Sequence, residues 1–177
     1  GLLKARGEFV IFLDDDNTLR PKALEQLYKL IIKGPYEVVY GDMWIASANA
    51  AGIAMDFDLQ RLSLQNYIDT SAALIDRQTI LDIGGWDETL PKFVDWNLFV
   101  RLAKSGARFK RLPQFTFDYN IHLENKSHRV KAQTYSHPEL GQLFVPTFDP
   151  VDCKVKIQNF EPYKAPKVAI FTIHYDR

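Results

Sequence analysis

The sequence predicts an α/β sandwich, a fold class in which helices pack on the faces of an open sheet. Short apolar runs rich in β-branched and aromatic residues alternate with segments whose apolar residues recur at helical spacing. The first apolar run ends directly in three aspartates, Asp14 to Asp16. In open sheets of this class, ligands gather outside the carboxyl ends of the strands. The aspartates therefore lie where a site is expected.

The first part of the chain predicts a strand, an acidic loop and a helix. Residues 8–13 predict a buried strand, because a short apolar run there ends in polar turn residues. Pro21 suits the first turn of a helix, and apolar residues follow it at helical spacing until a Gly-Pro pair ends the pattern. Further strands are predicted at residues 37–46 and 71–75.

The next part of the chain continues the alternation of helices and strands. A short helix at residues 78–83 is followed by a Gly-Gly turn. Asp95 suits the N-cap of a second helix, at residues 96–105, which carries an apolar stripe and ends before a glycine. Strands at residues 108–112 and 115–120 are expected to follow.

Composition sets the broad class of the protein. A chain of 177 residues with 46% hydrophobic and 25% charged residues is typical of one globular domain. Lys plus Arg equals Asp plus Glu at 22 each, so no overall field attracts nucleic acid or an anionic membrane. Cys153 is the only cysteine, which excludes an internal disulfide. With no membrane span and no signal peptide in the sequence, we expect a cytoplasmic protein, and self-association into a homo-oligomer stays open.

The aspartate run predicts a metal site. Adjacent carboxylates repel one another unless a cation or a shared proton offsets their charge. Hard oxygen ligands suit Mg²⁺ or Mn²⁺. The alternative is a solvated turn or a helix cap, although a cap needs one acid and not three in succession.

One resemblance of the run is to the haloacid dehalogenase superfamily of phosphatases. The segment VIFLDDDNTL, residues 10–19, is similar to the opening Asp-x-Asp-x-Thr motif of that superfamily. The superfamily also needs a downstream Ser or Thr, then a Lys, then an acidic metal motif. The only Gly-Asp pair, Gly41-Asp42, comes far too early in that order. A phosphatase is therefore the weaker hypothesis.

A second resemblance, to the inverting GT-A-fold glycosyltransferases of family 2, explains more of the chain. Its Asp-x-Asp signature falls at Asp14 to Asp16, and order and spacing match over roughly residues 1–130. The matching segments are ARGEFVIFLDDDN at 5–17, TSAALI at 70–75, GGWDE at 84–88 and DWNLFVRLAKSG at 95–106.

This resemblance implies a fold and a reaction. The expected fold is the GT-A (Rossmann-like) sandwich of nucleotide-diphospho-sugar transferases. The implied activity is metal-dependent transfer of a hexosyl or N-acetylhexosaminyl group, with inversion, from a nucleotide-diphosphate donor to a hydroxyl acceptor. A UDP-sugar is the family's commonest donor, and the acceptor is a saccharide or another hydroxyl compound.

The same resemblance implies roles on the donor side. A divalent cation bridging the donor's phosphates stabilises the charge that develops as the C1–O bond breaks. The implied metal ligands are Asp14, Asp16 and His122. The implied donor-binding residues are Asp14, Asp15, Lys126 and Arg129.

On the acceptor side, inversion needs a base that takes the hydroxyl proton. The resemblance assigns this role to Asp95, whereas the family's usual partner acid is replaced here by Val94. Aromatic faces and carboxylates suit a sugar's apolar faces and hydroxyls. The acceptor-binding candidates are Trp86, Asp87, Glu88 and Trp96, with a core position as the alternative for both tryptophans.

The resemblance also divides the chain. Residues 1–130 match the metal and acceptor part of a GT-A domain, whose nucleotide-binding half would precede them, so we expect a domain truncated at the N-terminus. Residues 131–165 predict an irregular extension, and residues 166–177 a strand. That strand either begins a further module or fills the vacated place in the sheet. A catalytically inactive fragment that serves as a binding or assembly module is the alternative to an enzyme.

Overall fold

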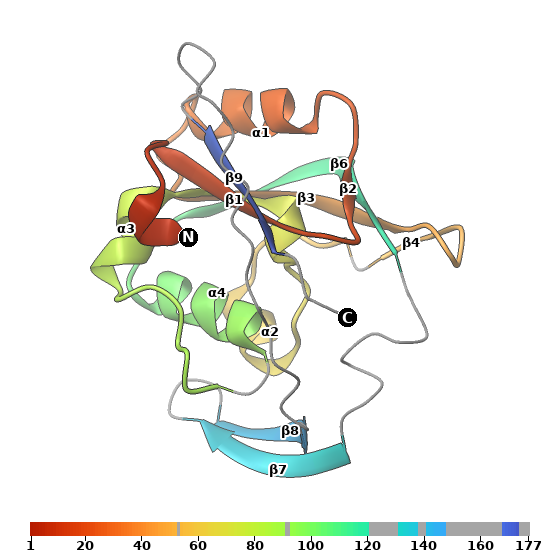
Figure 1. The fold of residues 1–177 in the computed structure, drawn as a ribbon, viewed down its shortest axis with the longest axis vertical. Helices are drawn as coiled ribbons and strands as arrows, with labels where there is room; N and C mark the ends of the chain where they lie inside the picture. Colours follow the sequence, from red (N-terminus) through yellow and green to blue (C-terminus); the bar gives the residue numbers. More distant parts are fainter. Residues whose placement is uncertain (53, 91–92, 121–130, 138–140, 148–167, 174–177) are drawn as a thin grey trace.

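A mixed sheet forms the centre of the molecule in the computed structural model, which describes residues 1–52, 54–90, 93–120, 131–137, 141–147 and 168–173 (Figure 1). The strand order is β2-β6-β3-β5-β1-β9, and β4 pairs with β3. The strands are β1 (Phe9–Asp14), β2 (Thr18–Leu19), β3 (Val38–Ile45), β4 (Ala50–Ala51), β5 (Ala73–Asp76), β6 (Phe109–Tyr119) and β9 (Val168–Ile173).

Four of these strands, β1, β3, β6 and β9, run in the same direction. β9 pairs parallel with β1, and β6 pairs parallel with β3. β5 lies between β1 and β3 and is antiparallel to both. Asp14 is in register with Ile173, and Ile45 with Tyr119, so the carboxyl ends of the parallel strands share one edge of the sheet. Because β5 runs the other way, its first residue, Ala73, lies at that same edge.

Helices cover both faces of the sheet (Figure 1). α1 (Ala23–Ile31) packs on one face, and α2 (Leu59–Leu64), α3 (Arg77–Asp82) and α4 (Val94–Lys104) pack on the other. Short 3₁₀ turns lie at η1 (Leu2–Lys4) and η2 (Thr70–Ala72).

Alternate residues of the central strands divide the core into two layers. Val10 and Phe12 of β1 pack in the layer under α4, whereas Phe9 and Ile11 pack in the layer under α1. This period of two is what a strand buried on both faces produces. It explains why the continuous apolar run at residues 9–13 correctly predicted a strand.

The two strands predicted at residues 108–112 and 115–120 are one strand, β6. Leu112 pairs with Gly41 and Phe115 pairs with Asp42, so the register shifts between them. The two intervening residues, Pro113 and Gln114, form a bulge. A proline cannot donate to a sheet ladder, and a bulge is one of the places where a strand tolerates it.

The prediction that Asp95 caps α4 is wrong. The helix begins at Val94, and its N-cap is Phe93, which adopts a left-handed backbone with φ 60° and makes no side-chain cap. Asp95 lies in the first turn of the helix. Its carboxylate instead accepts a hydrogen bond from the side chain of Asn66.

Residues 131–165, predicted to be irregular, contain two strands, β7 (Lys131–His137) and β8 (Gly141–Thr147). They form a separate antiparallel pair, in which Ala132 is in register with Pro146. A proline in a strand at a sheet edge is tolerated, because its missing N–H can lie on the side that faces away from the partner strand. The division of the chain into domains stays a prediction.

The C-terminal strand β9 lies at the edge of the central sheet, beside β1. This pairing is compatible with the hypothesis that the strand fills an otherwise vacant place in the sheet. Within the described residues, none of the helices reaches the length and apolarity that a bilayer crossing requires.

Candidate active site

Five aspartates gather near the carboxyl edge of the sheet. Asp14 ends β1, and Asp15 and Asp16 form the turn after it. Asp69 directly precedes η2 and β5, which start at this edge. Asp95 reaches the same region from the first turn of α4. The topology thus brings together carboxylates from three segments that are distant in the sequence.

A pocket of about 370 Å³ opens between these elements. Two of the five carboxylates, Asp69 and Asp95, line it together with five other residues, Met43, Ile45, Asn66, Phe93 and Tyr119. Apolar side chains thus stand beside the acids. Such a mixture suits a ligand that carries hydroxyl groups on a partly apolar body, which is the character of a sugar.

Hydrogen bonds hold the aspartate turn against the neighbouring strands. Asn17 Nδ2 donates to Ser71 Oγ at 3.0 Å and to Asp14 Oδ2 at 3.4 Å. The backbone N–H of Asp14 also donates to Ser71 Oγ, at 3.4 Å. On the other side, Asn120 donates through its backbone N–H to Asn17 Oδ1 and through Nδ2 to the carbonyl of Asp16. The turn is therefore pinned between the start of β5 and the end of β6.

The electrostatics of the turn favour a cation. Burial, the largest cause, and the charges of Asp69, Asp16, Asp95 and Asp15 together raise the pKa of Asp14 to about 8. A buried carboxyl among like charges is protonated at neutral pH unless a positive charge stabilises its ionised form. A divalent cation would supply that charge, and carboxylate oxygens are the ligands that Mg²⁺ and Mn²⁺ prefer.

Asp69 and Tyr119 line the pocket, and their pKa values are also raised by burial and by the neighbouring carboxylates. Burial first, and the Asp95 charge second, raise the pKa of Asp69 to about 6, against a lowering by its hydrogen bonds with Ser71. The backbone N–H of Ser71 donates to Asp69 Oδ1 at 2.7 Å. Burial, followed by the charge of Asp69, raises the pKa of Tyr119. Strongly shifted groups that cluster in a pocket indicate a functional site.

The described residues do not by themselves complete a metal centre. Among them, no group of three or more His, Cys, Asp or Glu side chains is placed to hold an ion. His122, the third predicted ligand, lies outside the described residues, as do Lys126 and Arg129. The oxygen donors at Asp14 and Asp16 fit the chemistry of a hard divalent cation, and their role as ligands stays a prediction.

Asp95 occupies a position suited to an anion that must stay ionised. The first turn of a helix favours negative charge because unsatisfied backbone N–H groups point out of it. Asn66 Nδ2 also donates to Asp95 Oδ2 at 2.8 Å. The left-handed backbone of Phe93, a conformation rarely adopted by a residue with a large side chain, directly precedes this turn.

The acceptor-binding predictions divide into two groups. Trp96 occupies the core position that was the alternative for it: it is 7% exposed, and its indole N–H donates to the carbonyl of Leu62. Trp86 is partly buried against the core, edge-on to Phe12 with ring centroids 5.0 Å apart. Aromatic residues suit a core as well as a sugar site, so the residue type alone did not separate the two.

Asp87 and Glu88 lie in the turn after α3, and neither belongs to the lining of the pocket. Asp87 accepts hydrogen bonds from the backbone N–H and the hydroxyl of Thr89, at 3.1 and 2.6 Å. Glu88 is exposed. Their predicted contact with an acceptor therefore depends on how far that acceptor extends beyond the pocket.

Asp69, Asn66 and Tyr119 line the pocket but were not predicted from the sequence. Asp69 directly precedes the segment TSAALI, and that position was the available signal. The signal becomes decisive only when β5 is known to be antiparallel to β1, because only then does the start of β5 lie beside the end of β1.

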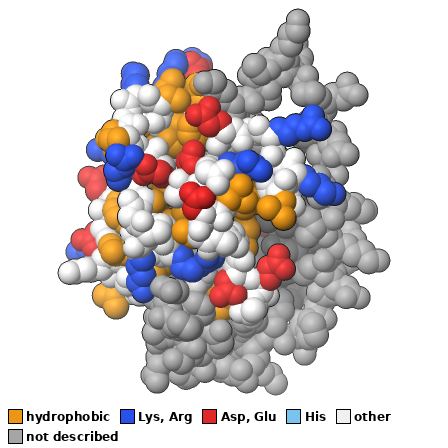
Figure 2. All heavy atoms as spheres, turned by 90° about the vertical axis from the view of Figure 1, so that its left-hand side faces the viewer, with side chains coloured by type: hydrophobic (Ala, Val, Ile, Leu, Met, Phe, Trp, Pro, Cys, Tyr) orange, Lys and Arg blue, Asp and Glu red, His pale blue; other side chains and the backbone are white. Residues whose placement is uncertain are grey.

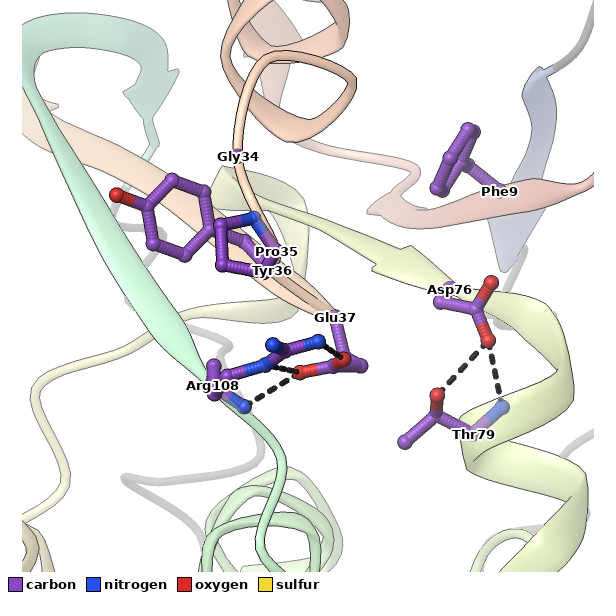
Figure 3. Close-up of a pocket in the computed structure, with 8 residues that line it drawn as sticks. All are labelled: Phe9, Gly34, Pro35, Tyr36, Glu37, Asp76, Thr79 and Arg108. Atoms are coloured by element: carbon purple, nitrogen blue, oxygen red, sulfur yellow. Dashed lines mark hydrogen bonds and ion pairs between the residues drawn. The ribbon is translucent and has the colours of Figure 1, made fainter.

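A second pocket, of about 350 Å³, lies at the opposite, amino edge of the parallel strands (Figure 3). Both acids in this pocket, Glu37 and Asp76, accept hydrogen bonds from neighbouring residues. The Glu37 carboxylate accepts from Arg108 through the backbone N–H at 2.7 Å and Nε at 3.1 Å, and Arg108 lowers the pKa of Glu37. Asp76 accepts from Thr79 through the backbone N–H and the hydroxyl, which caps α3. These partners indicate a structural role for this edge.

Charges on the face of the molecule that carries α3 are mixed in sign. Figure 2 shows acidic and basic side chains interspersed there without a large patch of either sign. This surface agrees with the equal counts of acidic and basic residues in the sequence, 22 each. The described residues of this face therefore present no field of one sign to a polyanionic partner.

Two family models match adjacent parts of the chain. The family described as "Glycosyl transferase family 2" matches residues 1–74, and the one described as "Glycosyltransferase like family 2" matches residues 56–136. The two overlapping matches together cover residues 1–136, which include the aspartate turn, β5, α4 and β6. They therefore include every described aspartate of the site.

Among curated proteins, the chain is similar to the "Pre-mycofactocin glycosyltransferase" of Mycobacterium tuberculosis. The two are 29% identical over 126 aligned residues, and the alignment covers 64% of this chain and 27% of the relative. The chain thus spans about a quarter of that relative's length.

Among solved structures, the chain resembles Staphylococcus aureus TarS. The structure of TarS 1-349 in complex with UDP-GlcNAc has a TM-score of 0.57 at 16% identity and covers 70% of this chain and 38% of TarS 1-349. The complex with UDP has a TM-score of 0.56 at 17% identity and covers 68% and 38%. The likeness is one of fold, and it confirms the predicted GT-A class.

Proposed function

Since the chain belongs to glycosyltransferase family 2, we propose that it transfers a sugar from a nucleotide-diphosphate donor to a hydroxyl acceptor, with inversion at C1 of the sugar. One observation carries this proposal. Carboxylates from three separate segments meet at the carboxyl edge of the sheet, where burial first, and then their mutual charge, raises the pKa of Asp14 and of Asp69. Such an arrangement destabilises the fold. Binding a cation and accepting a proton from the acceptor are functions that would explain why these carboxylates are grouped.

On the donor side we propose a UDP-sugar. TarS, which shares the fold, was solved with UDP-GlcNAc and with UDP. The acidic turn would repel a diphosphate in the absence of a cation. A bound Mg²⁺ or Mn²⁺, held by Asp14 and Asp16 with the predicted help of His122, would offset this repulsion and the charge of the leaving diphosphate.

On the acceptor side we propose Asp95 as the base. The acceptor oxygen attacks C1 as its proton passes to the Asp95 carboxylate, and the bond from C1 to the diphosphate oxygen breaks. Asp95 lines the pocket beside Asp69, Asn66 and Tyr119, whose polar groups are available to orient hydroxyls. Met43 and Ile45 supply the apolar wall against which a sugar ring can pack.

Asp69 supplies a second carboxylate beside Asp95 that the residues next to Asp95 in the sequence do not provide. The family's usual partner acid is replaced by Val94, yet Asp69 provides a second carboxylate in the pocket that Asp95 lines. Its pKa, raised to about 6, lets it exchange a proton near neutral pH. We propose that it contacts the acceptor hydroxyls.

The test is a transfer assay with a panel of UDP-sugars and simple sugar acceptors, in the presence of Mn²⁺. Asp95→Asn should lower kcat by about 10²- to 10⁴-fold, because it removes the base but keeps the shape. Asp82→Asn, on the exposed surface of α3, is the matched control and should retain activity. Full activity of Asp95→Asn would contradict the proposed base. Donor binding without turnover in the wild type would favour the alternative, an inactive binding module.

A further inference from the structure

Asn66 makes an unusual pair of contacts beside the pocket. Its Nδ2 donates to Asp95 Oδ2 at 2.8 Å. Its Oδ1 is buried and has no hydrogen-bond partner, and among the described residues it is the only buried side-chain oxygen or nitrogen of that kind. An unpaired buried carbonyl oxygen costs stability, whereas an apolar side chain of the same shape would avoid that cost. The position is therefore poorly suited to stability alone.

Several titratable groups of the described residues interact electrostatically with Asp95. Asp69 lines the same pocket from the segment before η2, and Asp14 at the end of β1 interacts with Asp95 through its charge. Asp16 in the following turn and Tyr119 on β6 belong to the same interacting group. Like charges favour the protonated form of a carboxyl, and a protonated carboxyl cannot act as a base.

The Asn66 amide acts in the opposite direction. A hydrogen bond donated to a carboxylate favours the ionised form of that carboxylate. An amide does so without a full positive charge, which would make the carboxylate a weaker base. The bond also fixes where Oδ2 points.

We propose that Asn66 is a positioning residue that holds the Asp95 carboxylate ionised and directed at the acceptor hydroxyl. The inference rests on the proposed function, because Asp95 is a base only in that reaction. Once Asp95 has taken the proton, a half-turn of the amide presents Oδ1 as the acceptor for the new O–H. Asn66 Oδ1, which is unpaired while Asp95 is ionised, thus gains a hydrogen-bond donor when Asp95 is protonated.

The test compares Asn66→Leu with Gln65→Leu, a control at the exposed neighbouring residue. Asn66→Leu keeps the approximate shape and removes both the donor and the unpaired oxygen. We expect its melting temperature to equal or exceed that of the wild type. We expect kcat to fall by about tenfold or more with little change in the donor KM, and the acidic limb of the kcat profile to move to higher pH. Gln65→Leu should change none of these.

A purely structural Asn66 predicts a different pattern. Asn66→Leu would then lower the melting temperature, and activity would fall only in proportion to the unfolded fraction. Unchanged kcat and an unchanged acidic limb in a folded Asn66→Leu protein would overturn the proposal.

A second measurement separates this proposal from the proposed function. NMR titration of the Asp95 side-chain carboxyl carbon needs no turnover, and we expect a higher pKa in Asn66→Leu than in the wild type. An unchanged Asp95 pKa overturns the role of Asn66 alone. A wild-type protein that transfers no sugar removes the proposed function, and with it the catalytic purpose of the hydrogen bond, even if the pKa moves as expected.

Discussion

Carboxylates at the carboxyl edge of the sheet differ from those in its body and at its amino edge. Glu37 at the amino edge and Asp42 in β3 each accept hydrogen bonds from an arginine, Arg108 and Arg111. At the carboxyl edge, the charges that shift the pKa of Asp14 are all other carboxylates. The first arrangement stabilises the fold, whereas the second works against it.

This difference indicates which edge of the sheet carries the candidate functional site. Burial and like charges together raise the pKa of Asp14 to about 8, which is a cost that folding alone gives no reason to keep. Strongly shifted groups concentrate at sites where charge must be bound or protons moved. The carboxyl edge is therefore the candidate site, and the carboxylates that are paired with arginines elsewhere are the comparison for it.

The largest expected effect on stability is the loss of a paired carboxylate. Asp42 Oδ1 and Oδ2 accept from Arg111 Nε and Nη2, each at 2.7 Å, and Asp42 is 7% exposed. Asp42→Ala would leave the Arg111 guanidinium without this partner inside the protein. We expect the free energy of unfolding to fall by about 3 kcal/mol, as measured by denaturant titration. A loss well below 1 kcal/mol would mean that this pair is no more stabilising than a surface one.

The next effect has the opposite sign. Because the pKa of Asp14 is raised to about 8 in the folded state, its contribution to stability is fully present below about pH 4 and is lost as the pH rises towards 8. Asp14→Asn cannot ionise, so at pH 8 it should be more stable than the wild type by more than about 1 kcal/mol.

Thermal unfolding from pH 5 to pH 8, in the presence of a chelator, measures this effect. The melting temperature of the wild type should fall relative to that of Asp14→Asn as the pH rises. Asp82→Asn, an exposed substitution of the same kind, should follow the wild type. If the melting temperatures of all three proteins changed in parallel with pH, the pKa of Asp14 would not be raised. The carboxylates at the carboxyl edge would then not differ from the paired ones elsewhere.

The smallest effect is expected at the amino edge. Arg108 is 56% and Glu37 25% exposed in their ion pair, so water and salt screen it. Glu37→Gln should cause only a slight loss of thermal stability in dilute buffer, and the loss should vanish in about 1 M salt. A loss that persists in salt would show that the second pocket depends on the charge of Glu37.

The sequence predicted those parts of the fold that depend on local patterns. Apolar runs buried on both faces identified β1, β3 and β5 to within two residues. The position of the aspartates followed from the polar turn after β1. Element boundaries failed where backbone geometry departs from the preference of the residue, as at Phe93, whose left-handed conformation moves the start of α4.

The rest of the site depends on contacts that no local pattern encodes. Asp69 and Asn66 reach the pocket because β5 is antiparallel to β1 and because Asn66 follows α2 across from α4. α2 itself has six residues and gave no clear period in the sequence. Trp96 fits a core and a sugar site equally well by type, and its burial decided between them.

The most direct test of a metal-diphosphate site at the carboxyl edge is calorimetric titration of the protein with UDP in the presence of Mn²⁺. We expect saturable binding that requires both UDP and Mn²⁺. This binding should be lost in Asp16→Asn and should persist in Asp95→Asn and in the control Asp82→Asn. Wild-type binding that Asp16→Asn retains in full would contradict the account, because the diphosphate and its cation would then be held without the aspartate turn.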